Sequence, residues 1–145
     1  MKVRNITSFG IISLIIFVFI LGIIIYLIAK QTTENYSQYN PTIQTLKTEI
    51  LKCFPELTNL QIYEGDKSYT VNKEKIYLCI KDKNRKTYDK NILMYVLLHE
   101  IAHTLCNEVG HTQQFKDIFN VLLKRAELCN IYTPVEIPKD YCDFT

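Results

Sequence analysis

An apolar segment near the N-terminus places the strongest constraint on this chain. Residues 5–29 contain no Asp, Glu, Lys or Arg, and Phe9–Ala29 is a run of 21 residues rich in Ile, Leu, Phe and Val. A helix of about 20 apolar residues crosses a hydrocarbon core about 30 Å thick. The run is longer than the apolar part of a signal peptide, and no Ala-x-Ala cleavage pattern follows it. We therefore expect an uncleaved transmembrane anchor over residues 9–29, after a short tail of residues 1–8.

The basic residues that flank the anchor predict its orientation. Lys2 and Arg4 precede it, whereas Lys30 follows it and the next basic residue is Lys47. Lys and Arg concentrate on the cytosolic side of membrane spans. We expect a single-pass membrane protein with a cytosolic N-terminus and a lumenal or external C-terminal domain.

The charge of the remaining chain excludes a strongly basic nucleic-acid binder. Residues 31–145 carry 14 Lys and Arg against 15 Asp and Glu, which gives a net charge of −1. The basic loop Lys81–Lys90 is interrupted by Asp82 and Asp89, and a solvated loop explains it. These 115 residues suffice for one small core but not for two domains.

The sequence patterns predict a small α+β domain over residues 41–145, joined to the anchor by a polar stalk of residues 30–40. Thr42–Phe54 has helical spacing of apolar residues between two prolines. The tail Ile131–Thr145 is expected to be extended. Short strands are expected at three places: Leu60–Tyr63, Tyr69–Val71 and Lys75–Ile80.

Two further helices are predicted in the second half of the domain. The first, from Asn91 to about Cys106 with Asp89 or Asn91 as its cap, is apolar around most of its circumference, which is typical of a buried helix. The second begins after a Thr112 cap and ends near Cys129. Polar residues within the buried helix need partners, because an unpaired polar group is costly to bury.

Those polar residues form the motif His-Glu-x-x-His, with His99, Glu100 and His103. Positions i and i+4 of a helix lie on one face, so the two imidazoles can bind one Zn²⁺. Glu100 is offset by one residue and can act on a zinc-bound water, whose pKa zinc lowers to about 7. The motif predicts peptide hydrolysis, with Glu100 as the general base.

A catalytic zinc ion needs a third protein ligand and an open fourth position. His111 is the first candidate, because it follows the helix-breaking Gly110 and is the one remaining histidine. Three alternatives remain open: the carboxylates of Glu108 and Asp117, and the thiolate of Cys106 on the histidine face of the helix.

The five cysteines include no Cys-x-x-Cys pair, which argues against a zinc ribbon. In an oxidising compartment they could form up to two disulfides and leave one cysteine over. In a reducing compartment they would be small core residues.

The stretch HEIAHTLCNEVGHTQQF resembles the WLM and SprT-like metallopeptidases, in which a downstream His and then an aromatic residue follow His-Glu-x-x-His. Here these residues are His111 and Phe115. The resemblance covers roughly residues 75–130, which is about the extent of the compact core of zincin metallopeptidases. It implies a minimal zincin-like domain, with a small antiparallel or mixed sheet beside the active-site helix and its flanking helices. The gap from His103 to His111 is longer than in the WLM pattern.

The resemblance also implies an edge strand, here Lys75–Ile80, that pairs with the extended backbone of a protein or peptide substrate. Ile76 and Leu78 would then lie beside the substrate. Tyr132 and Tyr141 in the tail are candidates for stabilising an oxyanion, or simply pack the tail against the core. The DNA-bound substrates of the named families are not carried over, because this chain has an anchor and a nearly neutral domain.

The anchor, the short zincin-like domain and the tail together also resemble metallopeptidases predicted in large DNA viruses, which suggests a viral protein of a host or virion membrane. The favoured function is a membrane-anchored zinc metallopeptidase. The alternative is a non-catalytic, zinc-stabilised membrane or virion module, which would have no need of Glu100. The sequence indicates neither the substrate's identity nor the oligomeric state.

Overall fold

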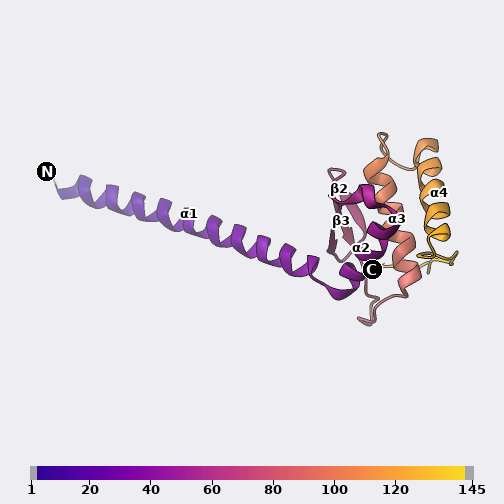
Figure 1. The fold of residues 1–145 in the computed structure, drawn as a ribbon. Helices are drawn as coiled ribbons and strands as arrows, with labels where there is room; N and C mark the ends of the chain where they lie inside the picture. The colour runs from indigo at the N-terminus through magenta and orange to yellow at the C-terminus, as the bar shows by residue number, and fades with distance from the viewer. Residues whose placement is uncertain (1–2, 143–145) are drawn as a thin grey trace. The chain divides into compact units, whose positions relative to one another are not determined.

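The computed structural model describes residues 3–142, and the chain falls into two compact units, Met1–Tyr36 and a second that begins at Ser37. Helix α1 (Val3–Gln38) forms the first unit, and its last two residues belong to the second (Figure 1). Its stretch Gly10–Thr33, 24 residues with a mean hydropathy of 3.3, is long and apolar enough to cross a membrane. A signal sequence meets the same criteria, so α1 could be a membrane span or a signal.

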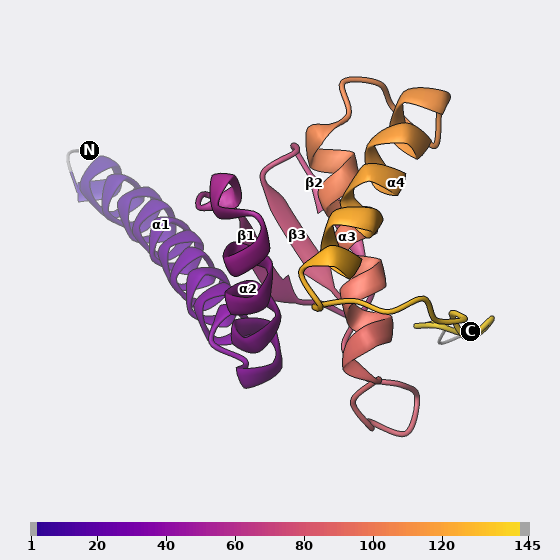
Figure 2. The same ribbon diagram turned by 45° about the vertical axis from the view of Figure 1, so that its right-hand side comes forward.

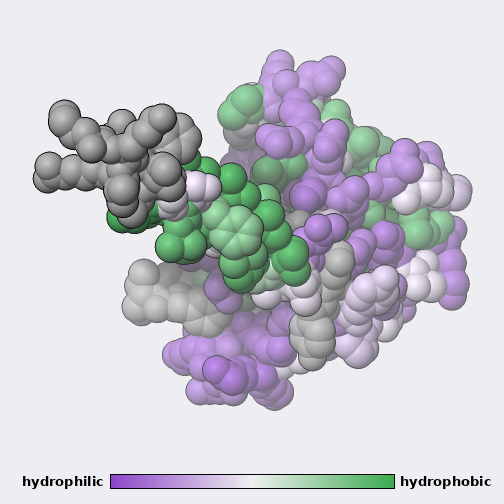
Figure 3. Space-filling model, turned by 90° about the vertical axis from the view of Figure 1, so that its left-hand side faces the viewer, coloured by the Kyte–Doolittle hydropathy of each residue, from purple (hydrophilic) through white to green (hydrophobic). Residues whose placement is uncertain are grey.

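Apolar side chains cover α1 over the predicted span. The large hydrophobic residues from Ile11 to Ile28 are exposed, and they gather along this helix in Figure 3. The helix then continues to Gln38, so most of the predicted stalk is helical. Thr32 and Thr33 accommodate this by donating hydrogen bonds to backbone carbonyls three or four residues earlier.

The second unit is an α+β domain in which three α-helices accompany a small sheet. Its predicted helices form with shifts of one residue: α2 is Pro41–Cys53, α3 is Lys90–Leu105 and α4 is Gln113–Leu128. Asn40, Asp89 and Thr112 cap them by accepting hydrogen bonds from backbone amides in the first turn. The remaining elements are the short 3-10 helix η1 (Pro55–Leu57) and the strands β1 (Gln61–Glu64), β2 (Tyr69–Val71) and β3 (Lys75–Leu78).

The three strands form a mixed sheet in the order β1-β3-β2 (Figure 2). β3 pairs with β1 in parallel and with β2 in antiparallel orientation. The expectation that Lys75–Ile80 is an edge strand is therefore wrong, because the backbone of β3 is paired on both sides. Ile76 and Leu78 are fully buried core residues, so neither side chain can line a substrate cleft.

One hydrophobic core joins α2, α3, α4 and the sheet. As predicted from its apolar circumference, α3 is the buried helix, with eight buried residues that include Glu100. The tail crosses back to the start of α3, where the Asn91 side chain bonds to the backbone and the hydroxyl of Thr133. The burial of α3 and these hydrogen bonds at its start fix the helix, and with it the motif that it carries.

Two disulfides close the domain, and Cys106 remains a buried free thiol. Cys53–Cys129 joins the end of α2 to the end of α4, and Cys79–Cys142 joins the residue after β3 to the tail. This matches the arrangement expected in an oxidising compartment, with two bonds and one cysteine left over.

Removing the Cys53–Cys129 bond with the double variant Cys53→Ala/Cys129→Ala is expected to lower the free energy of unfolding by about 2–4 kcal/mol. The bond links residues 76 positions apart, so its loss frees a long loop in the unfolded chain. Thermal unfolding of the full-length chain in one detergent measures the change. Cys106→Ala, which removes a buried thiol but no cross-link, is the control and should lower the stability less. An unchanged melting temperature in the double variant would contradict the prediction.

Candidate metal centre

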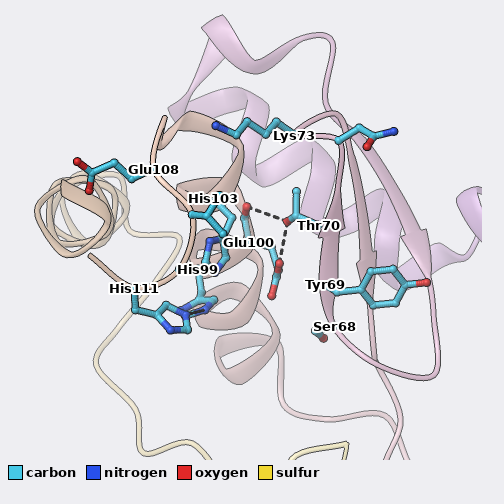
Figure 4. Close-up of a pocket in the computed structure, with 12 residues that line it drawn as sticks. Ser68, Tyr69, Thr70, Lys73, His99, Glu100, His103, Glu108 and His111 are labelled. Atoms are coloured by element: carbon cyan, nitrogen blue, oxygen red, sulfur yellow. Dashed lines mark hydrogen bonds between the residues drawn. The ribbon is translucent and has the colours of Figure 1, made fainter. Parts of the chain in front are cut away.

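The structure brings the three histidines together. His99 and His103 lie one turn apart on α3, and Gly110, with a φ of +85°, turns the chain so that His111 returns toward them. Each pair of these imidazole rings has its centroids 5.0 Å apart. One nitrogen from each ring lies within 4.8 Å of the others, so the three could hold a metal ion (Figure 4).

The distance between two of the ring nitrogens fits zinc. Zn–N bonds of about 2.0–2.1 Å at tetrahedral angles place two ligand nitrogens about 3.3 Å apart. Nε2 of His99 and Nε2 of His111 are 3.1 Å apart. Three imidazoles are also the ligand set of catalytic zinc sites that keep a fourth position open. The residues present therefore fit a zinc ion.

Phe115 supports all three imidazoles from α4. Its ring centroid lies 5.0 Å from that of His99, 4.3 Å from that of His103 and 4.8 Å from that of His111. Phe115 is itself buried, which restricts the rotation of the rings that it contacts. The aromatic residue that follows the third histidine in the sequence thus orients the three imidazoles.

The surroundings favour the neutral imidazoles that bind metals. Burial, followed by the charges of His103 and His111, lowers the pKa of His99 to about 4. Burial and the charge of His111 also lower the pKa of His103. Neither ring therefore needs to lose a proton at neutral pH before it can bind a cation.

The other candidate ligands lie outside this cluster. Glu108 lines the cleft, but its carboxylate points away from the three rings (Figure 4). Asp117 is exposed on α4, where it accepts a hydrogen bond from Gln113. Cys106 is buried and its thiol contacts Gln114. The geometry thus favours His111 as the third ligand.

Glu100 is buried on α3 and has a partner on β2. The Thr70 hydroxyl lies 2.7 Å from Glu100 Oε2 and 3.1 Å from the backbone carbonyl of Glu100 (Figure 4). Burial raises the pKa of Glu100, whereas the Thr70 hydrogen bond and the charge of His111 lower it. The need for a partner followed from the sequence, but its identity did not, because Thr70 lies 30 residues earlier in a short strand.

A cleft of about 600 Å³ opens at the histidines and Glu100. One side is lined by β2, the residue before it and the turn after it, and the other by the loop between α3 and α4. These residues are Ser68, Tyr69, Thr70, Asn72 and Lys73 on the first side and Glu108, Val109 and Gly110 on the second. The strand that borders this cleft is β2, which is also an edge strand of the sheet. The sequence had suggested Lys75–Ile80 as the edge strand beside the substrate.

Lys73 is a second residue of the cleft that sequence reasoning missed. Its ammonium group donates to the carbonyls of Cys106 and Asn107, 2.7 and 3.1 Å away, just beyond the C-terminus of α3. A cation at a helix C-terminus is favourable, because the last carbonyls lack partners within the helix. Asn72 and Lys73 both have positive φ, which shapes the turn that directs this side chain toward α3.

The two candidate tyrosines of the tail do not line the cleft. Tyr132 is buried and packs against Tyr95, which agrees with the packing alternative. The Tyr141 hydroxyl contacts Ser68 at 3.2 Å and donates to the carbonyl of Cys79, and burial raises the pKa of Tyr141 to about 12. Tyr141 thus reaches the cleft only through Ser68.

No known family model matches the chain, and no solved structure matches it. Three viral proteins do match. Protein 136R of Invertebrate iridescent virus 6 is 47% identical over 90 residues, which cover 59% of this chain and 51% of that protein. Protein 042R of Invertebrate iridescent virus 3 is 46% identical over 86 residues, which cover 58% of this chain and 54% of that protein.

Protein R325 of Acanthamoeba polyphaga mimivirus is 35% identical over 123 residues, which cover 78% of this chain and 59% of that protein. All three relatives are described as uncharacterized, and the chain spans about half the length of these curated proteins. The comparisons support the viral origin that the sequence suggested, whereas the likeness to WLM and SprT-like peptidases stays a prediction.

Proposed function

We propose that the second unit is a zincin-like peptidase that binds one Zn²⁺ through His99, His103 and His111. The observation that carries the proposal is the placement of Glu100, a buried carboxylate on the same helix as two of the histidines and lining the same cleft. A site that only binds metal has no need of this costly buried acid. Peptide hydrolysis does need it, as the group that moves a proton.

When bound, zinc supplies a Lewis acid that polarises a carbonyl and increases the acidity of water. Glu100 accepts a proton from the attacking water and passes it to the amine that leaves. Thr70 holds one oxygen of this carboxylate by its hydrogen bond to Oε2 and so sets the orientation of the other. The raised pKa of Glu100 brings the group closer to the working pH, which favours transfer of the proton in both directions.

The substrate is an extended segment of polypeptide that pairs with the outer edge of β2. The edge of a sheet offers backbone groups that can form main-chain hydrogen bonds with such a segment. β2 lies between the cleft and β3, and its Thr70 holds Glu100, so a segment added there passes directly over the site.

α1 anchors the peptidase in a membrane, with the second unit on its non-cytosolic side. The excess of basic residues before the apolar run supports this orientation, and so do the two disulfides, which persist in oxidising compartments. In this arrangement the substrates are proteins that come close to the same membrane.

The alternative, a module that zinc merely stabilises, is less well supported. Metals stabilise small domains whose core is insufficient. Here the domain has a hydrophobic core of 22 buried residues and two disulfides, and its histidines lie at the rim of an open cleft. Folding should therefore depend little on the metal.

Removal of the metal distinguishes the two functions. We expect the full-length chain, purified with about one Zn²⁺, to lose hydrolysis of an unfolded protein when zinc is chelated and to recover it when zinc is added back. Its melting temperature should fall, because a bound ion stabilises the folded state, but the chelated chain should stay folded at about 25 °C. Unfolding on chelation, without any hydrolysis by the zinc-loaded chain, would support the structural module and overturn the peptidase.

A further inference from the structure

Three tyrosines form a stacked row across the face of the sheet opposite to Ile76. Tyr63 of β1, Tyr77 of β3 and Tyr69 of β2 occupy paired positions in the register of the strands. The ring centroids of Tyr63 and Tyr77 are 5.3 Å apart, and those of Tyr77 and Tyr69 are 4.9 Å apart, with interplanar angles of 24° and 15°. Each strand thus contributes one ring to this tyrosine row.

The two ends of the tyrosine row differ. At the β1 end, Tyr63 is buried, and the Lys75 ammonium group lies 5.5 Å from the centre of its ring. At the β2 end, Tyr69 is 46% exposed and lines the cleft that holds the histidines and Glu100. Packing within the sheet accounts for Tyr63 and Tyr77, but it leaves one side of the Tyr69 ring without a neighbouring strand.

A strand added at the outer edge of β2 would continue this row. Successive side chains of a strand point to opposite faces of the sheet. In an added segment, the residue opposite Tyr69 and the residue opposite Thr70 therefore lie on different faces. The residue opposite Thr70 shares the face on which Thr70 reaches Glu100. The adjacent residue, opposite Tyr69, has its Cβ about 4.5–5.5 Å from that of Tyr69 and meets the open side of the ring.

We propose that Tyr69 selects an aromatic or broad apolar side chain at this position of the bound polypeptide, within about two residues of the bond that is cut. Aromatic pairs across strands stabilise a sheet, and a half-exposed ring loses contact with water when a flat apolar group covers it. The inference rests on the proposed function, because it names the substrate class that the same cleft accepts.

Mapping of cleavage sites tests the inference. The full-length, zinc-loaded chain in detergent digests a reduced and alkylated unfolded protein, and mass spectrometry identifies the bonds that are cut. We expect aromatic or large apolar residues at one fixed position from the cut, enriched about fivefold or more over their frequency in the protein. Tyr69→Phe keeps this enrichment, whereas Tyr69→Thr, which keeps a β-favouring residue but no ring, loses it and still cuts.

Tyr39→Thr is the matched control, because Tyr39 is 74% exposed and does not line the cleft. It should retain the enrichment. The inference is overturned if the wild type cuts without preference near the bond, or if Tyr69→Thr keeps the same preference.

Absence of any cleavage would count against the peptidase, and a binding measurement then tests Tyr69 separately. Fluorescence anisotropy compares labelled ten-residue peptides of Val, Thr and Ser that carry one central Phe or Ala. The Phe peptide should bind the Glu100→Gln chain about fivefold more tightly than it binds the Glu100→Gln/Tyr69→Thr chain, and the Ala peptide should not distinguish them. Equal affinities of the Phe peptide for both chains, or no binding, would overturn the inference.

Discussion

Glu100→Gln is expected to reduce the rate of hydrolysis of an unfolded protein by about 10²–10⁴-fold while about one zinc ion stays bound. The amide keeps the shape of the side chain and can still accept the hydrogen bond from Thr70. It cannot accept the proton of the attacking water, so the chemical step loses its base. Zinc content by atomic emission and cleavage of a fluorescent unfolded protein, both on the full-length chain, measure the two properties.

Glu108→Gln provides the matched control for this loss. Glu108 undergoes the same chemical change and lines the same cleft, but its carboxylate points away from the histidines. We expect the rate of cleavage by this variant to remain within about twofold of the wild type. A surface carboxylate that points away from the histidines is screened by salt and contributes little to the chemical step. Equal cleavage by Glu100→Gln and the wild type would remove the basis of the proposed mechanism.

His111→Ala is expected to weaken zinc binding by about 10²–10³-fold. A zinc site in a small protein contributes about 10–16 kcal/mol, shared among its ligands, so one lost imidazole accounts for several kcal/mol. Competition with a chromophoric chelator measures the affinity. Since His111 is exposed and lies beyond the end of α3, the fold itself should survive the change.

Glu108→Ala separates the two candidates for the third ligand. It removes the rival carboxylate from the same loop. We expect the affinity for zinc to stay within about threefold of the wild type, because a charge that does not bind the metal acts on it only at long range. If Glu108→Ala weakened binding as much as His111→Ala, or if His111→Ala left it unchanged, the ligand set inferred from the geometry would be wrong.

The parts of the fold that depend on local sequence were predictable. The apolar circumference of Asn91–Cys106 predicted the buried helix α3, and Thr112 was correctly expected to cap the next helix. The cluster of three histidines was also predictable, because a helical spacing of four residues and a turn at Gly110 leave few other positions for His111. Both follow from interactions between residues close together in the chain.

Pairing between distant segments was not predictable in the same way. Lys75–Ile80 has the strongest strand sequence, but nothing within it distinguishes an edge strand from a central one, and the structure places β3 in the centre. Thr70 was missed for the same reason, since many hydroxyl groups could satisfy a buried Glu100 and only the docking of β2 on α3 selects one. The partners of the cysteines likewise depend on the finished fold.

The short stretch of chain that carries the three clustered histidines affects the order in which the candidate site would form. His99, His103 and His111 lie within 13 consecutive residues, whereas the hydrogen bond from Thr70 to Glu100 spans 30. Contacts between near neighbours form earlier during folding than those that close long loops. For the peptidase proposed above, this order means that a newly made chain binds its ion on a nascent helix and becomes active only when the sheet docks, which would protect the unfinished protein from hydrolysis.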